Sequence, residues 1–97
     1  MFIQTENTPN PNSLKFIPGK IVSEDGPIEI LDKNDASNEL IFNILSLNGI
    51  RGIFLYQDFL TVNKNSEIDW SDLKHIIISY INDYYGKGNS SIIEKKI

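Results

Sequence analysis

Few side chains of this chain could do chemistry. Its 97 residues include no cysteine, so neither a thiolate nucleophile nor a disulfide can form. His75 is the only histidine, the residue type that most often acts as an acid or base near neutral pH. It lies off the apolar stripe of a predicted helix, which indicates a surface residue. No Gly-x-Ser-x-Gly elbow accompanies any serine, so the sequence favours a protein that is not an enzyme.

Acidic residues gather in two turn-like segments, but their spacing matches no metal site. Glu24 and Asp25 form one pair, and Asp32 and Asp35 form the other. Neither pair follows the ligand spacing of a calcium loop, and one histidine cannot make a zinc site without distant acids. We therefore expect no resident metal ion, and we interpret these carboxylates as solvated turn residues.

Composition and charge limit the remaining classes of function. The chain is 40% apolar and 10% aromatic, as in ordinary globular proteins, and its length fits one domain. A net charge of -4 argues against binding to DNA or RNA. No apolar run approaches the roughly 20 residues of a membrane span, and the start resembles neither a signal peptide nor a presequence. These features predict a bacterial cytoplasmic protein, or an already processed protein of the mitochondrial matrix.

The segment Thr8, Pro9, Asn10, Pro11 and Asn12 is the most specific part of the sequence. Each proline fixes its own φ, lacks an N–H group and extends the residue before it. The short polar side chains can bond to nearby backbone groups. The sequence therefore predicts a stiff loop between strands, and a well-made strand connection is its simplest interpretation.

The pattern on both sides of this loop predicts an α+β fold in two layers. We expect a mostly antiparallel sheet with two helices on one face, in the order β-β-(β)-α-β-β-α. The expected strands cover residues 2–6, 14–17, 28–30, 50–56 and 59–64, and residues 20–22 are expected to prolong the second. The expected helices cover residues 36–47, with Asp35 or Ser37 as cap, and residues 70–86, with Asp69 as cap.

The two strands that flank Gln57 and Asp58 should form a hairpin whose faces differ in chemistry. A two-residue loop pairs Leu55 with Leu60 and sorts the side chains by the period of the pleat. One face is aliphatic: Ile53, Leu55, Leu60 and Val62. The other carries Phe54, Tyr56, Phe59 and Thr61, and we interpret its aromatic residues as a docking patch with Lys15 and Arg51 as a basic rim. The alternative is that residues 7–13 or 23–35 fold over the aromatics as a second small core.

The proline-containing segment and its neighbours resemble the N-terminal domain of Nfu/NifU-type iron–sulfur scaffold proteins. The resemblance covers roughly residues 1–86 and rests on four segments: residues 2–20, 49–54, 58–62 and the helix start at Asp69-Trp70. In such scaffolds a Cys-x-x-Cys pair in a second, C-terminal domain holds the cluster. This chain has no cysteine, and hard carboxylates replace soft thiolates poorly. The resemblance thus implies a domain that binds no cofactor itself, with an iron–sulfur cluster on a missing C-terminal domain.

The resemblance also implies a function through protein contacts. The domain would assist cluster assembly or delivery by contacting iron–sulfur donors, apo-targets or its own C-terminal domain. Candidate contact or loop-defining residues are Thr8, Pro9, Asn10, Pro11, Asn12, Lys15, Arg51, Phe54, Tyr56 and Phe59. A stand-alone adaptor that binds proteins or peptides is the alternative, and a hydrolase or isomerase using His75 is a third possibility.

Residues 87–97 have the composition of a linker followed by a short apolar tail. Six terminal residues cannot form a core of their own, so they are expected to be a frayed tail or the first turns of a following domain. The resemblance slightly favours the second interpretation.

Overall fold

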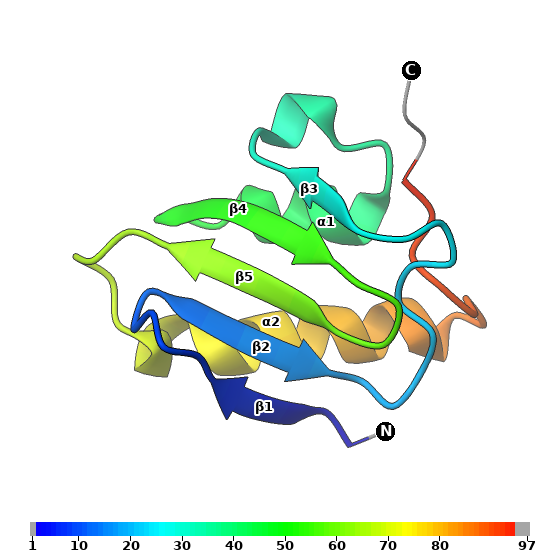
Figure 1. Cartoon of the computed structure of the whole chain (residues 1–97), viewed down its shortest axis with the longest axis horizontal. Helices are drawn as coiled ribbons and strands as arrows, with labels where there is room; N and C mark the ends of the chain where they lie inside the picture. Colours follow the sequence, from blue (N-terminus) through cyan, green and yellow to red (C-terminus); the bar gives the residue numbers. More distant parts are fainter. Residues whose placement is uncertain (1, 95–97) are drawn as a thin grey trace.

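The structure is a computed structural model that describes residues 2–94. Its elements are β1 (Gln4–Asn7), β2 (Ser13–Ile17), β3 (Ile28–Ile30), the 3-10 helix η1 (Lys33–Asp35), α1 (Glu39–Leu45), β4 (Ile50–Leu55), β5 (Leu60–Lys64) and α2 (Trp70–Gly86). Both helices lie behind the sheet in the view of Figure 1, so the other face carries no helix. The predicted two-layer α+β fold is confirmed.

The five strands form one antiparallel sheet in the order β1-β2-β5-β4-β3. The β4–β5 hairpin has the predicted register, with Leu55 opposite Leu60. The Tyr56 N–H donates to the Phe59 carbonyl at 2.9 Å and closes the turn. A bulge between Ile50 and Gly52 is an addition that the sequence did not predict.

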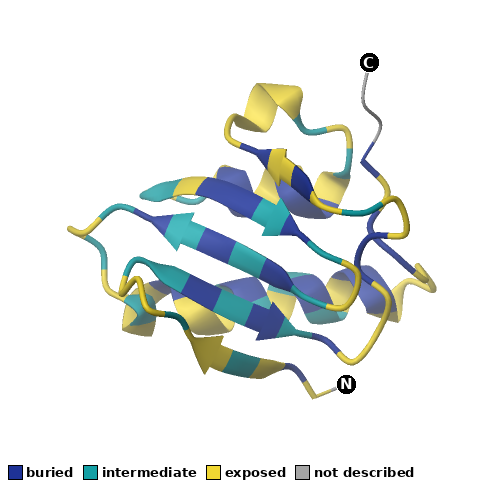
Figure 2. Ribbon diagram, in the orientation of Figure 1, coloured by how far each residue is buried: buried dark blue, intermediate teal, exposed yellow. Residues whose placement is uncertain are grey.

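The core lies between the sheet and the two helices. The aliphatic face of the hairpin is fully covered, since Ile53, Leu55, Leu60 and Val62 are 0% exposed. The helices contribute Ile41 and Ile44 from α1 and Leu73, Ile77 and Ile81 from α2. Figure 2 shows the resulting alternation along the central strands, where buried positions alternate with half-buried ones. The apolar positions that the helix period and the strand period predict therefore pack together in one core.

Helix α2 begins and ends where the sequence predicts. Asp69 occupies the cap position with extended backbone, but its side chain makes no capping hydrogen bond. The helix continues to Gly86, and His75 is exposed on it, as expected. Among residues 2–94, no helix has the length and apolar character needed to cross a bilayer.

The predicted start of the first helix was wrong. Residues 36–38 are not helical, and the cap of α1 is Asn38, whose side chain accepts the Leu40 N–H at 2.8 Å. Asp35 instead ends η1, a turn capped by Asp32. Polar residues that suit a cap occur at five of the seven positions 32–38, so composition alone could not select the right one.

The predicted extension of the second strand through residues 20–22 was also wrong. Gly19 has a φ of +73°, which turns the chain away from the sheet. Val22 is nevertheless fully buried, and its N–H donates to the Gln57 carbonyl at 2.7 Å. The segment therefore packs beside the β4–β5 turn without being a strand.

Residues 91–94 pack against the domain. Ser91, Ile92 and Glu94 are buried, although a linker or tail was expected over residues 87–97. Residues 95–97 of that expected tail lie outside the described residues. The division of the chain after residue 86 stays a prediction.

Candidate functional site

Three aromatic side chains stack on the sheet face that carries no helix. We call Phe54, Tyr56 and Phe59 the aromatic cluster. The rings of Phe54 and Tyr56 have centroids 6.2 Å apart, and those of Tyr56 and Phe59 are 4.6 Å apart, with interplanar angles near 20°. All three residues are half-buried. The chain's own β-pleat thus holds a flat apolar surface that water still reaches.

Lys15 extends this surface toward β1. Its Nζ lies 4.0 Å from the centroid of the Phe59 ring, a cation–π contact. The same Nζ lies 3.5 Å from a carboxylate oxygen of Glu6. Lys15 therefore packs on the aromatic cluster and also pairs with Glu6, and its role in a basic rim stays a prediction.

The proline-containing segment borders the aromatic cluster. A hollow of about 240 Å³ lies between them, lined by Thr8, Ser13, Phe54, Tyr56, Thr61 and Asn63. A second hollow of about 280 Å³ lies on the other side of the segment and reaches Trp70, and both hollows share Thr8 and Ser13. Residues 7–13 thus form one wall of the surface. Neither this segment nor residues 23–35 cover the three rings completely, because all three stay half-buried.

Internal hydrogen bonds give this segment its shape. The Thr8 hydroxyl donates to the Asn10 carbonyl at 2.8 Å, and the Asn10 side chain accepts the Asn12 N–H at 2.9 Å. The Ser13 N–H donates to the Asn10 carbonyl at 3.0 Å and completes a turn. The polar side chains do satisfy nearby backbone groups, as the sequence predicts.

Two residues outside the segment anchor it to the domain. The Trp70 indole N–H donates to the Pro11 carbonyl at 3.0 Å, and Lys64 Nζ donates to Asn12 Oδ1 at 3.2 Å. Lys64 is only 7% exposed, and its Nζ lies 5.6 Å from the centroid of the Trp70 ring. The Trp70 ring in turn meets Phe16 edge-on. The loop is therefore held in place by the first turn of α2 and the end of β5.

Sequence reasoning did not identify these anchors, although one signal was present. Lys64 continues the alternation of Leu60 and Val62, so the strand period directs its side chain toward the helices. A cation at an inward position needs a buried partner, and that requirement points to a nearby polar loop.

The remaining candidates do not join the site. Arg51 is exposed within the β4 bulge, and its side chain makes no hydrogen bond or ion pair with residues 2–94. No group of three or more histidine and acidic side chains among the described residues could hold a metal ion.

The comparisons with known proteins agree with this description. The family model described as the N-terminal region of scaffold proteins Nfu/NifU matches residues 3–88. The chain belongs to this family. The Nfu-type resemblance of the proline-containing segment is thereby confirmed, and the match includes both helices and all five strands.

Relatives of this Nfu N-terminal domain include two mitochondrial proteins. The human NFU1 iron–sulfur cluster scaffold homolog is 41% identical over 98% of this chain, and NifU-like protein 4 of Arabidopsis thaliana is 37% identical over 99%. The chain spans only 38% and 34% of those relatives' lengths. The solution structure of a NifU-like protein from Saccharomyces cerevisiae superimposes with a TM-score of 0.83 at 27% identity, over 98% of this chain and 86% of that one.

Proposed function

We propose that this Nfu N-terminal domain assists iron–sulfur cluster assembly or delivery through protein contacts, without ligating the cluster. The stacked, half-buried aromatic cluster on the open sheet face is the observation that carries the proposal. Family membership supports the link to cluster scaffolds, and the lack of cysteine supports the absence of a cluster on this chain. The compartment we propose is the mitochondrial matrix for a eukaryotic chain and the cytoplasm for a bacterial one.

The surface has the chemistry of a protein contact. Aromatic residues with two rotatable side-chain bonds lose little entropy on binding and bury a large area. The hollow beside them offers the hydroxyl of Thr61 and the amide of Asn63 for hydrogen bonds to a partner. Because the anchored loop holds one wall in place, the surface is largely formed before a partner arrives.

The test is a binding titration that compares the half-buried aromatic cluster with an exposed aromatic residue on the helix side. Isotope-labelled chain is titrated with a cluster-loaded donor or an apo-target protein, and amide shifts are followed by NMR. We expect shifts on β2, β4 and β5, and we expect the double variant Phe54→Ser, Tyr56→Ser to bind at least about tenfold more weakly. The control is Phe42→Ser on α1, which changes a residue that is 43% exposed on the helix side.

Two results would decide against the proposal. Equal loss of binding in the Phe42 variant would move the contact to the helix face. Binding of unrelated extended peptides at the same surface, with no preference for cluster donors or targets, would favour the stand-alone adaptor. The thermal midpoint of the double variant is measured in parallel, because a large fall would identify the rings as core.

A further inference from the structure

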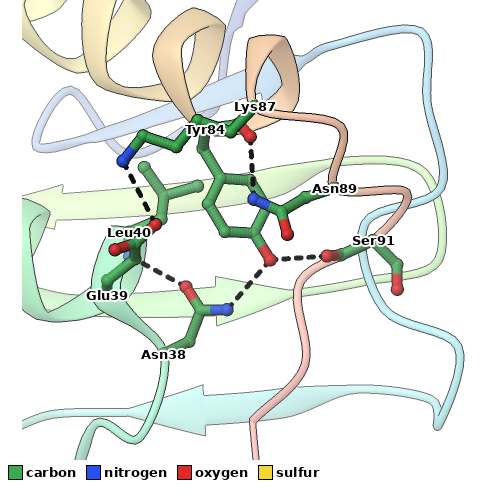
Figure 3. A network of polar contacts seen from close by, with 7 residues as sticks. All are labelled: Asn38, Glu39, Leu40, Tyr84, Lys87, Asn89 and Ser91. Carbon is green, nitrogen blue, oxygen red and sulfur yellow. Dashed lines mark hydrogen bonds and ion pairs between the residues drawn. The ribbon is translucent and has the colours of Figure 1, made fainter.

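The segment after α2 returns across the domain and packs beside Val22, Tyr84 and the residues before α1. We call residues 89–94 the strap. Gly88 has a φ of +97°, which reverses the chain after the helix. The Asn89 side chain then donates to the Tyr84 carbonyl at 2.8 Å, close to the end of α2. Figure 3 shows the strap passing beside Tyr84 toward the start of α1.

The middle of the strap is held through its backbone and one apolar side chain. The Ile92 N–H donates to the Val22 carbonyl at 2.7 Å, and the Ser91 carbonyl accepts the Tyr84 hydroxyl at 2.6 Å. Ile92 is 2% exposed and belongs to the core, whereas Ile93 beside it is 60% exposed. Along residues 92–94 the strap therefore directs Ile92 and Glu94 inward and Ile93 outward.

The strap ends on a buried carboxylate that meets three donors. Glu94 is 8% exposed. One of its oxygens accepts both the N–H and the hydroxyl of Ser37 at 2.8 Å, and the other accepts the Asn38 N–H at 2.9 Å. Asn38 caps α1 and also donates to the Tyr84 hydroxyl at 3.0 Å. Glu94, the helix cap and Tyr84 thus form one polar network.

We propose that the surface formed by Val22, Tyr84 and residues 37–38 is a docking site for a segment with an apolar side chain two residues before a carboxylate, and that Ser91–Glu94 is its intramolecular occupant. Val22 and the Tyr84 hydroxyl bind the backbone of the segment, the core receives its apolar side chain, and the residues before α1 bind its acid. Docking of the strap fixes the point at which the chain continues past Glu94. Its release would leave Asn38 and Tyr84 without these partners and would expose the surface that the strap covers.

The test is amide hydrogen exchange by NMR on the full chain. In Glu94→Ala, we expect exchange at Ile92 and Asn38 to accelerate roughly tenfold or more, since hydrogen bonds to an ionised acceptor are lost. Glu94→Gln, which keeps the shape but not the charge, should show a smaller acceleration. The central amides of β4 and β5 should exchange as before, because the strap lies outside the sheet. The matched control Ile93→Ala changes the exposed neighbour and should leave all of these rates unchanged.

A second variant keeps the proposal falsifiable if Glu94→Ala disturbs the whole fold. Tyr84→Phe retains the buried ring but removes the hydroxyl that joins Ser91 and Asn38, and it should accelerate exchange at Ile92 alone among the core amides. Unchanged exchange at Ile92 in both Glu94→Ala and Tyr84→Phe would overturn the proposal. Equal acceleration in Ile93→Ala would also overturn it, because the effect would then not depend on the inward side chains.

Discussion

Substitution of Asn12 tests whether the proline-containing segment is held by a buried cation. Asn12→Ala removes the side-chain oxygen that accepts a hydrogen bond from Lys64 Nζ at 3.2 Å. The ammonium group keeps the Asn65 carbonyl at 3.3 Å and the Trp70 ring, but Lys64 is 7% exposed and water cannot readily replace the lost acceptor. The variant therefore leaves a buried charge with too few partners.

The expected loss of stability depends on whether one or both partners of the Asn12–Lys64 hydrogen bond are removed. A hydrogen bond to a charged group contributes roughly 1.5 to 3 kcal/mol, so we expect Asn12→Ala to lower the free energy of unfolding by about 2 kcal/mol. Lys64→Met keeps the apolar stem and removes the charge, so its cost should be below about 1 kcal/mol. Once Lys64 is Met, adding Asn12→Ala should cost almost nothing more. The coupling energy of the pair should thus be about 1 to 2 kcal/mol.

The assay is urea and thermal unfolding of the wild type, both single variants and the double variant, followed by far-ultraviolet circular dichroism. For a domain of this length, about 2 kcal/mol corresponds to a fall of roughly 10 °C in the thermal midpoint. Fluorescence of the single tryptophan, Trp70, gives a second probe beside the anchor. Additive effects of the two substitutions, or a larger loss for Lys64→Met than for Asn12→Ala, would refute this reasoning.

Three further predictions concern the anchor, a turn and a phenol. Trp70→Phe keeps a ring beside Phe16 but loses the bond to the Pro11 carbonyl, so it should cost about 1 kcal/mol and broaden the NMR signals of residues 8–12. Gly49→Ala should lower the free energy of unfolding by about 2 kcal/mol or more in urea unfolding, since φ is +90° and the new Cβ would lie 2.5 Å from Ile68 Cγ1. Its control is Gly26→Ala, where φ is +88° but the space is open, and this variant should lose clearly less stability. Equal losses in the two variants would contradict this prediction. Burial and then the neighbouring Tyr84 raise the pKa of Tyr85 from 10.0 to about 12, so the folded state retains this proton longer than the unfolded state. The unfolding free energy should be unaffected by Tyr85 below pH 10 and should fall by on the order of 1 kcal/mol as the pH rises from 10 to 12, a fall that Tyr85→Phe should reduce.

The sequence predicted those parts of the fold in which local pattern and packing agree. In the β4–β5 hairpin, a two-residue loop predicted the pairing of Leu55 with Leu60, and the period-two alternation supported it because it placed all the aliphatic side chains on one face. Helix α2 was likewise predictable from its start at Asp69 and its apolar stripe.

Features set by distant residues could not be predicted in this way. The start of α1 depends on Glu94, which satisfies the N–H groups of Ser37 and Asn38 from 56 or more positions away. The burial of Ser91 and Ile92 depends on Val22 and Tyr84, whereas the sequence of residues 87–97 predicted a linker and a short apolar tail. For the candidate site, the loop and the aromatic cluster were named from the sequence, but their contact through Thr8 and Ser13 needed the topology.

Anaerobic reconstitution tests the central claim most directly, namely that this Nfu N-terminal domain supports cluster chemistry without holding a cluster. The 97-residue chain is incubated with ferrous iron, sulfide and a thiol reductant, desalted, and its visible absorption and bound iron are measured. With no thiolate ligand present, we expect a colourless protein with no stoichiometric iron. A stable visible chromophore with bound iron and sulfide after desalting would contradict the account.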